Sequence, residues 1–340
     1  MKRLLATTAT AVCVLALCAA PAAAQGGGLA SPVCPAGTTT LGVPDSKQAA
    51  QDACQQAYDV YQFMAPELGL ALAGGNATLG VGGTLGGLGH FSVGVRGNAF
   101  SGLLPDVTNF QQSTSGAKQQ QLPTKTQFIG LPAADAEIGL FKGIPLGLTN
   151  VGGVDALVSA TYIPKINSSG IAVTPKQNLQ LGWGARVGLL QESLLVPGVS
   201  VTYLKRDLPE TDIVGTSGAN SLSITGLKLN TTAWRLTASK NFILFNLAAG
   251  VGQDSYDQSA TITATVNQGG FSGSSTVPGT SQTLKRTNYF LDAGLDLPLI
   301  KLVGELGQVS GGTVNTYNSF KGGRADRSQT YFSAGIRLGF

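Results

Sequence analysis

From residue 68 to the C-terminus, apolar and polar side chains alternate along the chain with a period of two. In residues 179–189 every second position is Leu, Trp, Ala or Val, and the positions between them hold Gln, Gly or Arg. Residues 90–96 repeat the pattern, with Phe91, Val93 and Val95 as the apolar members. Side chains on a strand point alternately to opposite faces. Each such segment therefore predicts a β-strand with one apolar and one polar face.

Composition narrows the kind of β protein that this pattern describes. Only 12% of the 340 residues are charged, 47 are glycine, and the mean hydropathy is +0.16. Beyond the first 24 residues, no run approaches the roughly 20 apolar residues that a membrane helix needs. Such a chain can cross a membrane only as a closed barrel, because every backbone group in lipid must be bonded within the protein. We expect an all-β fold, a closed antiparallel transmembrane β-barrel.

The alternation predicts ten clear strands between about residue 90 and residue 340. Two glycine-rich candidates, residues 67–73 and 77–83, are shorter than the roughly 9 to 11 residues with which a strand crosses a bilayer. They either complete a barrel of twelve strands or fold into the lumen. We expect 10–14 strands, with twelve as the best estimate.

Connection lengths indicate how the barrel is oriented. The connections near residues 101–132, 164–177, 208–220, 267–282 and 311–327 are long and polar, and those between them are mostly short. Short periplasmic turns and long outer loops are typical of bacterial outer-membrane barrels. If the last strand runs toward the periplasm, every long loop lies outside the cell.

The first 24 residues have the pattern of a cleavable export signal. Lys2 and Arg3 provide the basic start, an apolar stretch follows to residue 20, and Ala22 to Ala24 form a small-residue cleavage site. A lipoprotein signal is the alternative, but bulky Leu17 precedes Cys18 where such a signal needs a small residue. The expected domains are a signal peptide (1–24), a linker with an amphipathic helix (25–66) and the barrel (67–340).

The expected helix begins at Asp45 and ends before Pro66, with Ala, Cys, Val, Tyr and Met recurring at helical spacing between them. We expect it to plug the lumen or to form a periplasmic cap. Removal of the signal leaves Cys34 and Cys54, an even count in an oxidising compartment, which predicts a disulfide between the linker and the helix.

The last strand carries a resemblance to a known group of proteins. Its outward face is predicted to consist of Phe332, Ala334, Ile336, Leu338 and Phe340. This pattern resembles the C-terminal signal by which the barrel assembly machinery recognises bacterial outer-membrane β-barrel proteins. The resemblance implies that this machinery and the outer-membrane lipid are partners, that the chain resides in the cell outer membrane, and that Phe332, Ile336, Leu338 and Phe340 form the assembly signal.

A second resemblance concerns the N-terminal third. A leader, then the small-residue stretch of residues 72–79, then a first long strand, is similar to the long-chain fatty-acid transporter family of the outer membrane. The resemblance implies an N-terminal plug and a hydrophobic small-molecule ligand that leaves sideways through the barrel wall.

Charged residues on the expected inner face are the candidate functional residues. These lumen-lining candidates are Arg96, Asp135, Glu137, Asp155, Arg186, Arg206, Arg235, Asp292, Asp296, Glu305 and Arg337. In a narrow barrel they fill the interior as ion pairs, and in a wider one they line an aqueous or ligand path. Few large apolar residues accompany them, namely Leu157, Leu190, Leu204, Leu244 and Phe290.

Other chemistry has little support. His90 is the only histidine, so a hydrolase must use it, with Ser92 on the same face as a candidate nucleophile. His90 however begins a strand on the expected periplasmic rim. The glycines of residues 80–86 lack dinucleotide-binding spacing and favour either a tight hairpin or a close approach of backbones. The net charge of +4 without a basic cluster argues against nucleic acid. We expect neither an enzyme nor a cofactor or metal site.

Two functions therefore fit the sequence. The first is a transport or channel protein, with hydrophobic solutes as one substrate class. The alternative is a non-conducting structural or surface-interaction barrel whose long outer loops bind a partner.

The closing strand generates the first prediction. Deleting Phe340 removes a side chain worth only about 2–3 kcal/mol even if fully buried, so stability in detergent should fall modestly. The outer-membrane yield in cells should fall much further, because the truncated chain lacks its assembly signal. Gly339→Ala, on the opposite face at the same depth, is the control. Equal outer-membrane yields of the two variants would contradict the assembly role.

Overall fold

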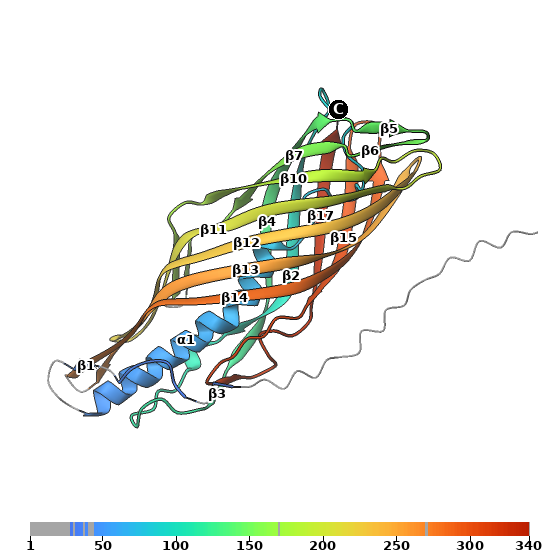
Figure 1. Ribbon diagram of the computed structural model, residues 1–340. Helices are drawn as coiled ribbons and strands as arrows, with labels where there is room; N and C mark the ends of the chain where they lie inside the picture. The colour runs from blue at the N-terminus through green and yellow to red at the C-terminus, as the bar shows by residue number, and fades with distance from the viewer. Residues whose placement is uncertain are drawn as a thin grey trace, which may run out of the picture.

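The main element of the computed structural model is a closed antiparallel β-barrel, with residues 28–29, 31–36, 38–39, 44–168, 171–268 and 271–339 described (Figure 1). Ten strands pair in the order β10-β7-β4-β2-β17-β15-β14-β13-β12-β11, and β11 pairs back with β10. They are β2 (Phe91–Pro105), β4 (Thr124–Phe141), β7 (Val154–Tyr162), β10 (Leu179–Leu190), β11 (Gly198–Ser217), β12 (Asn220–Phe242), β13 (Phe245–Gln268), β14 (Phe271–Asp296), β15 (Lys301–Ser310) and β17 (Gln329–Gly339).

The strand count lies at the lower end of the predicted range, and the best estimate of twelve is wrong. Residues 67–73 belong to a helix, and residues 77–83 contain turns and no strand. Both segments occupy the lumen, which was the alternative that the sequence left open. Their short length and glycine content were the correct signals, since neither segment can cross a bilayer as a strand.

The outer wall carries the apolar side chains that the alternation predicts. Leu291, Leu306 and Phe332 are neighbours on three successive strands and are 64%, 58% and 53% exposed. Trp183 and Leu181 on β10 are similarly exposed. Large apolar side chains arranged around a closed wall fit contact with lipid, and they alternate with inward polar residues. Among the described residues, no helix is both long and apolar enough to span a membrane.

The two ends of the barrel differ. At one end, here called the turn end, the strands are connected by residues 142–153, 191–197, 243–244 and 297–300. At the other end, here called the loop end, they are connected by residues 106–123, 163–178 and 311–328. The smaller elements are β1 (Thr38–Thr39), η1 (Val107–Asn109), β3 (Gln121–Leu122), β5 (Ile144–Leu146), β6 (Thr149–Val151), β8 (Ile166–Ser168), β9 (Ile171–Pro175) and β16 (Ser319–Phe320). β17 finishes at the turn end, so the loop end is the extracellular one.

Two of the predicted long loops are instead strand extensions. Residues 208–220 and 267–282 fall largely within two hairpins, whose strands β11, β12, β13 and β14 contain 20, 23, 24 and 26 residues. Crossing a bilayer takes roughly 9–11 residues per strand. The remainder of each strand projects beyond the membrane at the loop end.

Along β13 the apolar side of the strand changes from outside to inside. Near the turn end, Leu247 and Val251 face outward, and Asn246 and Asp254 are buried inside. Beyond Gln253, the outward positions are polar, and the buried inward positions become apolar at Tyr256, Ile262, Ala264 and Val266. The surroundings of each face explain this exchange. The outer face of β13 meets lipid and then water, and the inner face meets polar groups and then a helix.

That helix, α1 (Pro44–Ala73), is 30 residues long and differs from the prediction at both ends. It begins at Pro44, a favourable first position, so Asp45 lies inside its first turn and is no N-cap. It continues through Pro66 instead of stopping there. No residue between Ala49 and Ala73, all of which the structure describes, is exposed. Enclosure on all sides stabilises the helix despite the backbone hydrogen bond that proline removes.

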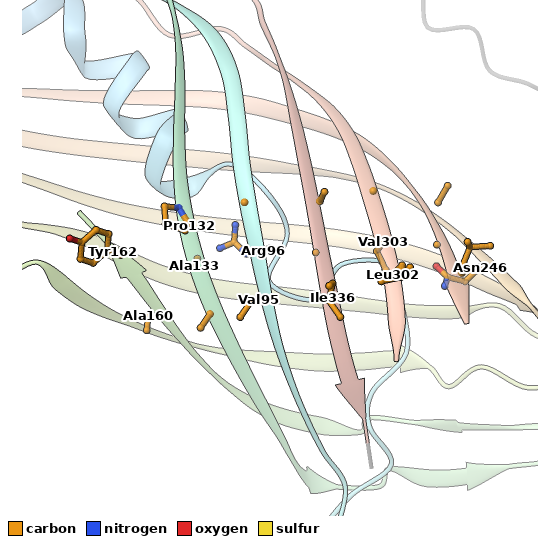
Figure 2. A pocket seen from close by; sticks show the side chains of 18 of the residues that line it. Val95, Arg96, Pro132, Ala133, Ala160, Tyr162, Asn246, Leu302, Val303 and Ile336 are labelled. Atoms are coloured by element: carbon orange, nitrogen blue, oxygen red, sulfur yellow. The ribbon is translucent and has the colours of Figure 1, made fainter. Parts of the chain in front are cut away.

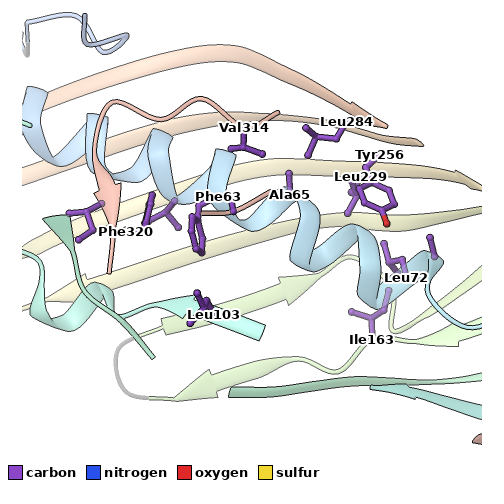
Figure 3. Packing of buried hydrophobic residues seen from close by; sticks show 14 residues of the cluster. Phe63, Ala65, Leu72, Leu103, Ile163, Leu229, Tyr256, Leu284, Val314 and Phe320 are labelled. Carbon is purple, nitrogen blue, oxygen red and sulfur yellow. The ribbon is translucent and has the colours of Figure 1, made fainter. Parts of the chain in front are cut away.

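α1 enters the barrel from the loop end, opposite the C-terminus (Figure 1). Its first half packs against the extended β12–β14 strands, and Cys34 and Cys54 form the predicted disulfide beside Ala264 and Val266. Its middle contributes to an apolar cluster with Leu229, Tyr256 and Leu284 of the wall (Figure 3). Of the two predicted roles, the helix is a plug and not a periplasmic cap, because the periplasmic end of the barrel is the turn end.

The direction of α1 generates the second prediction. An epitope tag inserted between the exposed Ser31 and Pro32 should bind its antibody on intact cells, since this segment lies at the extracellular loop end. A matched tag between Leu194 and Leu195, 91% and 76% exposed in a turn-end connection, should bind only after the outer membrane is permeabilised. The reverse pattern of accessibility would contradict the assigned orientation.

Candidate functional site

The end of α1 lies inside the barrel, where three wall arginines meet its last carbonyl groups. The Arg206 guanidinium donates hydrogen bonds to the carbonyl oxygens of Leu72, Ala73 and Gly75 at 3.2–3.3 Å. Arg235 donates to Ala73 at 3.4 Å, and Arg96 donates to Gly74 at 3.3 Å. Helix C-terminal carbonyls lack partners within the helix and carry partial negative charge. Guanidinium groups supply both the donors and the opposite charge.

The chain after α1 runs through the lumen to β2, and wall carboxylates bind its backbone N–H groups. Glu305 accepts from Asn76 at 3.2 Å, Asp292 from Gly80 at 2.8 Å, and Asp155 from Leu85 at 3.1 Å. Neutral wall groups take part as well, since the Ser239 hydroxyl accepts from Gly82 at 2.7 Å. The wall thus satisfies the plug backbone along its length. We call α1 and residues 74–90 together the plug.

Two glycines show why this segment is rich in glycine. Gly80 has a φ of +71°, which disfavours other residues, and its amide reaches Asp292. A Cβ at Gly82 would lie only 2.5 Å from the Ser239 backbone nitrogen and 2.7 Å from the Gly198 carbonyl oxygen. The predicted close approach of backbones is therefore found here, between the plug and strands β11 and β12.

The wall charges also pair with one another. Arg186, fully buried, contacts Glu137 and Asp155 at 2.8 Å each, and Arg337 contacts the other oxygen of Glu137 at 2.8 Å. These pairs join strands β4, β7, β10 and β17 along one side of the inner wall near the turn end. Buried charges persist only when paired and hydrogen-bonded, so each member depends on the others.

Two further pairs lie closer to the end of α1. Arg96 contacts Asp135 at 2.6 Å, and Arg235 contacts Asp254 at 2.5 Å. Both arginines also donate to the plug backbone, so each pair links wall to wall and wall to plug at once.

Ten of the eleven lumen-lining candidates are buried on the inner face, as predicted. The exception is Asp296, which lies half-buried at the turn end beside Lys301, with the ion pair at 3.0 Å. The sequence prediction missed Asp254 and Arg286, both fully buried inside the barrel. Asn246, Ala248 and Gly250 are successive inward positions of β13. Continuing this period of two for two more inward positions reaches Asp254.

Little space remains beside the plug. The cavity between it and strands β2, β4 and β17 has a volume of about 10 Å³ and is bordered by Ala77, Leu79 and Ser92. One water molecule needs roughly 10–15 Å³. This part of the lumen therefore holds at most about one water and offers no passage to a solute.

A groove of about 1090 Å³ lies on the outer wall (Figure 2). Its floor is a row of small residues that are register neighbours on β14, β15, β17 and β2, namely Ala293, Gly304, Ala334 and Gly97. Larger side chains, among them Leu302, Ile336 and Val95, border it. On the inner side of the same strands Arg96 and the plug fill the lumen, so the groove belongs to the lipid-facing surface.

Three carboxylates of α1 that the sequence prediction missed hold the loop-end loops. Asp52 accepts hydrogen bonds from the backbone N–H groups of Ser113 and Lys118 at 2.7 and 3.0 Å. Asp59 accepts from the N–H groups of Tyr317 and Asn318 at 2.9 and 2.8 Å.

The third carboxylate, Glu67, accepts from the Leu103 N–H at 3.2 Å and contacts Arg327 at 3.1 Å. All three are buried and follow one another at intervals of seven and eight residues, about two helical turns, which puts them on one helix face. The polar face of α1 is therefore covered by loops and not by water.

The two loops are also joined to each other. β3 and β16 pair as parallel strands, and the Gln120 N–H donates to the Asn318 side chain at 3.0 Å. We call the assembly of the first half of α1, loops 106–123 and 311–328, and the outer parts of strands β11–β14 the loop-end platform.

His90 and Ser92 each have a different hydrogen-bond partner. The His90 Nδ1 lies 3.3 Å from the Gly87 carbonyl oxygen, and the Ser92 hydroxyl accepts a hydrogen bond from Arg337 at 3.1 Å. Within the described part of the chain, no group of three His, Cys, Asp or Glu side chains could hold a metal ion.

The outward face of β17 is placed as predicted. Phe332, Ile336 and Leu338 are 53%, 46% and 36% exposed toward the lipid side. Phe340 lies outside the described residues, as does the predicted signal peptide of residues 1–24.

The closed wall, its apolar outer surface and its charged inner surface define a β-barrel protein of the bacterial outer-membrane type, located in the cell outer membrane. No family model matches the chain, and no curated protein matches it, so membership of the long-chain fatty-acid transporter family is not shown.

Solved structures with a similar architecture include three with different activities. The outer membrane protease OmpT from Escherichia coli shares 9% identity over 74% of this chain and 95% of its own, with a TM-score of 0.34. The transport unit of the Escherichia coli autotransporter AIDA-I shares 10% over 85% and 99%, with a TM-score of 0.34. The Pseudomonas putida toluene transporter TodX shares 11% over 79% and 97%, with a TM-score of 0.32. The function must therefore be argued from this chain's own residues.

The third prediction concerns pH at the loop-end platform. Burial raises the pKa of Asp59 from its ordinary value of 3.8 to about 6, against the hydrogen bonds from Asn318 and Tyr317, which lower it. The folded state therefore binds this proton more tightly than the unfolded state does. This tighter proton binding contributes fully to the free energy of unfolding below about pH 4. The contribution, at most about 3 kcal/mol, is lost as the pH rises through 6.

We expect the thermal unfolding midpoint of the wild type to fall more between pH 4.5 and 7.5 than that of Asp59→Asn. The control is Asp257→Asn, which changes an exposed carboxylate on the outer face of β13. Circular dichroism scans in one detergent measure all three proteins. The same pH dependence in Asp59→Asn and the wild type would contradict the assignment.

Proposed function

We propose that this protein is a closed surface-interaction barrel, in which a plugged wall holds the loop-end platform outside the cell. The single observation that carries the proposal is the bonding of the plug backbone to buried wall charges through the lumen. Arg206 alone donates three bonds to the end of α1, and Asp292 and Glu305 accept bonds from the segment that follows. This arrangement favours the non-conducting alternative over the transport hypothesis.

The cost of opening supports this choice. A solute path would require residues 74–90 to leave the lumen, and that movement strips partners from several buried charges. Leaving one buried charge without its partner costs roughly 3–5 kcal/mol. With at least Arg206, Asp292 and Glu305 affected together, thermal opening is rare. The inner face also offers few large apolar side chains to a hydrophobic solute, since Leu244 is 66% exposed in a turn-end connection and not inward as predicted.

The construction of the loop end supports a binding role. Hydrogen bonds donated by loop N–H groups to Asp52 and Asp59 fix two loops of 18 residues each to α1. The disulfide and the extended hairpins hold α1 in turn. Loops that serve only as connections need no such anchoring, whereas a binding surface benefits from a fixed shape. We propose no catalytic role, because His90 and Ser92 are engaged with Gly87 and Arg337.

The fourth prediction tests closure. In planar bilayers the refolded wild type should show no steady conductance steps, because the plug fills the lumen. Arg206→Ala removes the contacts of the Arg206 Nη1 with three plug carbonyl groups, which share its two hydrogens. At roughly 1.5 kcal/mol for each of two charge-assisted hydrogen bonds, the opening probability should rise about a hundredfold. Intermittent steps are the expected result.

Lys205→Ala is the matched control, because Lys205 is the adjacent residue on the outer face of β11 and pairs with Asp207 there. It should remain silent. Heat-modifiable gel mobility confirms that each barrel is folded before recording. Steady steps in the wild type would refute the closed barrel, and silence of folded Arg206→Ala would refute the role of the plug bonds.

A further inference from the structure

The loop-end platform contains a cavity of about 510 Å³ that no part of the closure argument uses. It lies between the middle of α1, the end of loop 106–123 and loop 311–328, with Phe63, Gln119 and Ser319 among the residues that line it. Small-molecule sites in proteins have volumes of roughly 300–1,000 Å³. The cavity is therefore large enough for a small ligand, and it lies on the extracellular side.

The cavity walls are held in place by bonds already described and by one more. Asn318 is fixed by Asp59, which accepts both its backbone N–H and its side-chain amide at 2.8 Å. The Tyr317 hydroxyl donates to the Ala117 carbonyl oxygen at 3.2 Å, which ties the two loops together across the cavity. A ligand would therefore meet a preformed shape and would spend little of its binding free energy on ordering loops.

The lining combines aromatic and neutral polar groups. Phe63 and Phe320 stack with ring centroids 4.0 Å apart and are only 1% and 8% exposed, so the accessible edge of Phe320, with Val314 and Ala325, forms the apolar side. Gln119 and Ser319 add an amide and a hydroxyl, which can both donate and accept hydrogen bonds. The cation in the lining, Arg324, is already paired through its Nε and Nη2 with the Asp326 carboxylate.

This chemistry discriminates among ligand classes. A fatty chain would leave the amide and hydroxyl groups without partners, and burying unpaired polar groups is costly. An anion would have to compete with Asp326 for Arg324. An uncharged ring that carries several hydroxyl groups satisfies both halves of the lining, because its C–H face packs on the small apolar side while its hydroxyls pair with the amide and hydroxyl groups.

We propose that this cavity binds a neutral sugar, as a free mono- or disaccharide or as the end of a surface glycan. The proposal rests on the proposed function and deepens it, since it assigns a ligand class to the loop-end platform. Gln119 and Ser319 bind the sugar hydroxyls, and the apolar side of the cavity, at Phe320, Val314 and Ala325, contacts the ring.

Calorimetric titration of the full mature chain, refolded in an amine-oxide detergent without a sugar headgroup, tests the proposal. The probes are maltose, lactose and N-acetylglucosamine, with glucuronate and glucosamine as the acidic and basic comparisons. At least one neutral probe should bind, and more tightly than both charged ones. Failure of all three neutral probes to bind, or a preference for glucuronate, would overturn the assigned ligand class.

Two variants locate the site. Gln119→Ala and Ser319→Ala should each weaken binding about fivefold, since each removes one hydrogen bond to a neutral partner. Gln112→Ala is the control, an exposed residue of the same loop outside the cavity lining, and it should bind like the wild type. Unchanged affinity in both lining variants would overturn the site. The bilayer recordings separate the two proposals, because a silent barrel that binds no sugar refutes only the ligand, whereas a conducting wild type refutes closure whatever it binds.

Discussion

The structure depends on the pairing of backbone groups where a helix ends inside a membrane barrel. The last carbonyl groups of α1 have no partners within the helix, and the segment that follows presents the N–H groups of Asn76, Gly80 and Leu85 to the wall. Both sets lie where water is scarce, so an unpaired group would cost about 1–3 kcal/mol. Arginines on the wall supply donors to the first set, and carboxylates supply acceptors to the second. The charged side chains of the lumen thus make the hydrogen bonds that water would otherwise make to the plug backbone.

Space is the second condition for a helix inside ten strands, because a barrel of this size is normally filled by its own side chains. Here glycines at the contacts make room. A Cβ at Gly69 of α1 would overlap the Tyr256 ring, and one at Gly335 of β17 would come within 2.9 Å of Leu79. The glycine content therefore marks positions where plug and wall touch. Arg96, Arg206 and Arg235 fit the same interior because they reach the plug backbone itself.

The parts that could be predicted from sequence are those governed by one local rule. A period of two fixes which side of each strand meets lipid, so the inward placement of Arg186 and Glu305 and the outward placement of Phe332 follow directly. The prediction that the helix ends at Pro66 is wrong, because helix propensity alone does not include the stabilisation that enclosure by the barrel provides. Asp52 and Asp59 were missed for a related reason. A polar helix face ordinarily meets water, and nothing local to the helix shows that distant loops cover it.

The extended hairpins and the outer half of α1 are stable only together. Strands beyond the membrane no longer have lipid on one side, so their apolar side chains must turn inward, as Tyr256 and Ile262 do on β13. Those inward side chains need a partner, and the Ala-rich face of α1 provides it through Ala57 and Tyr61. The remaining polar face of α1 then requires cover, which Asp52 and Asp59 obtain from the loops. The extended strands, α1 and the loops thus each have a face that is covered only when the next of them is in place. The loops form the outermost of these layers, and they expose polar side chains such as Gln119 and Ser319.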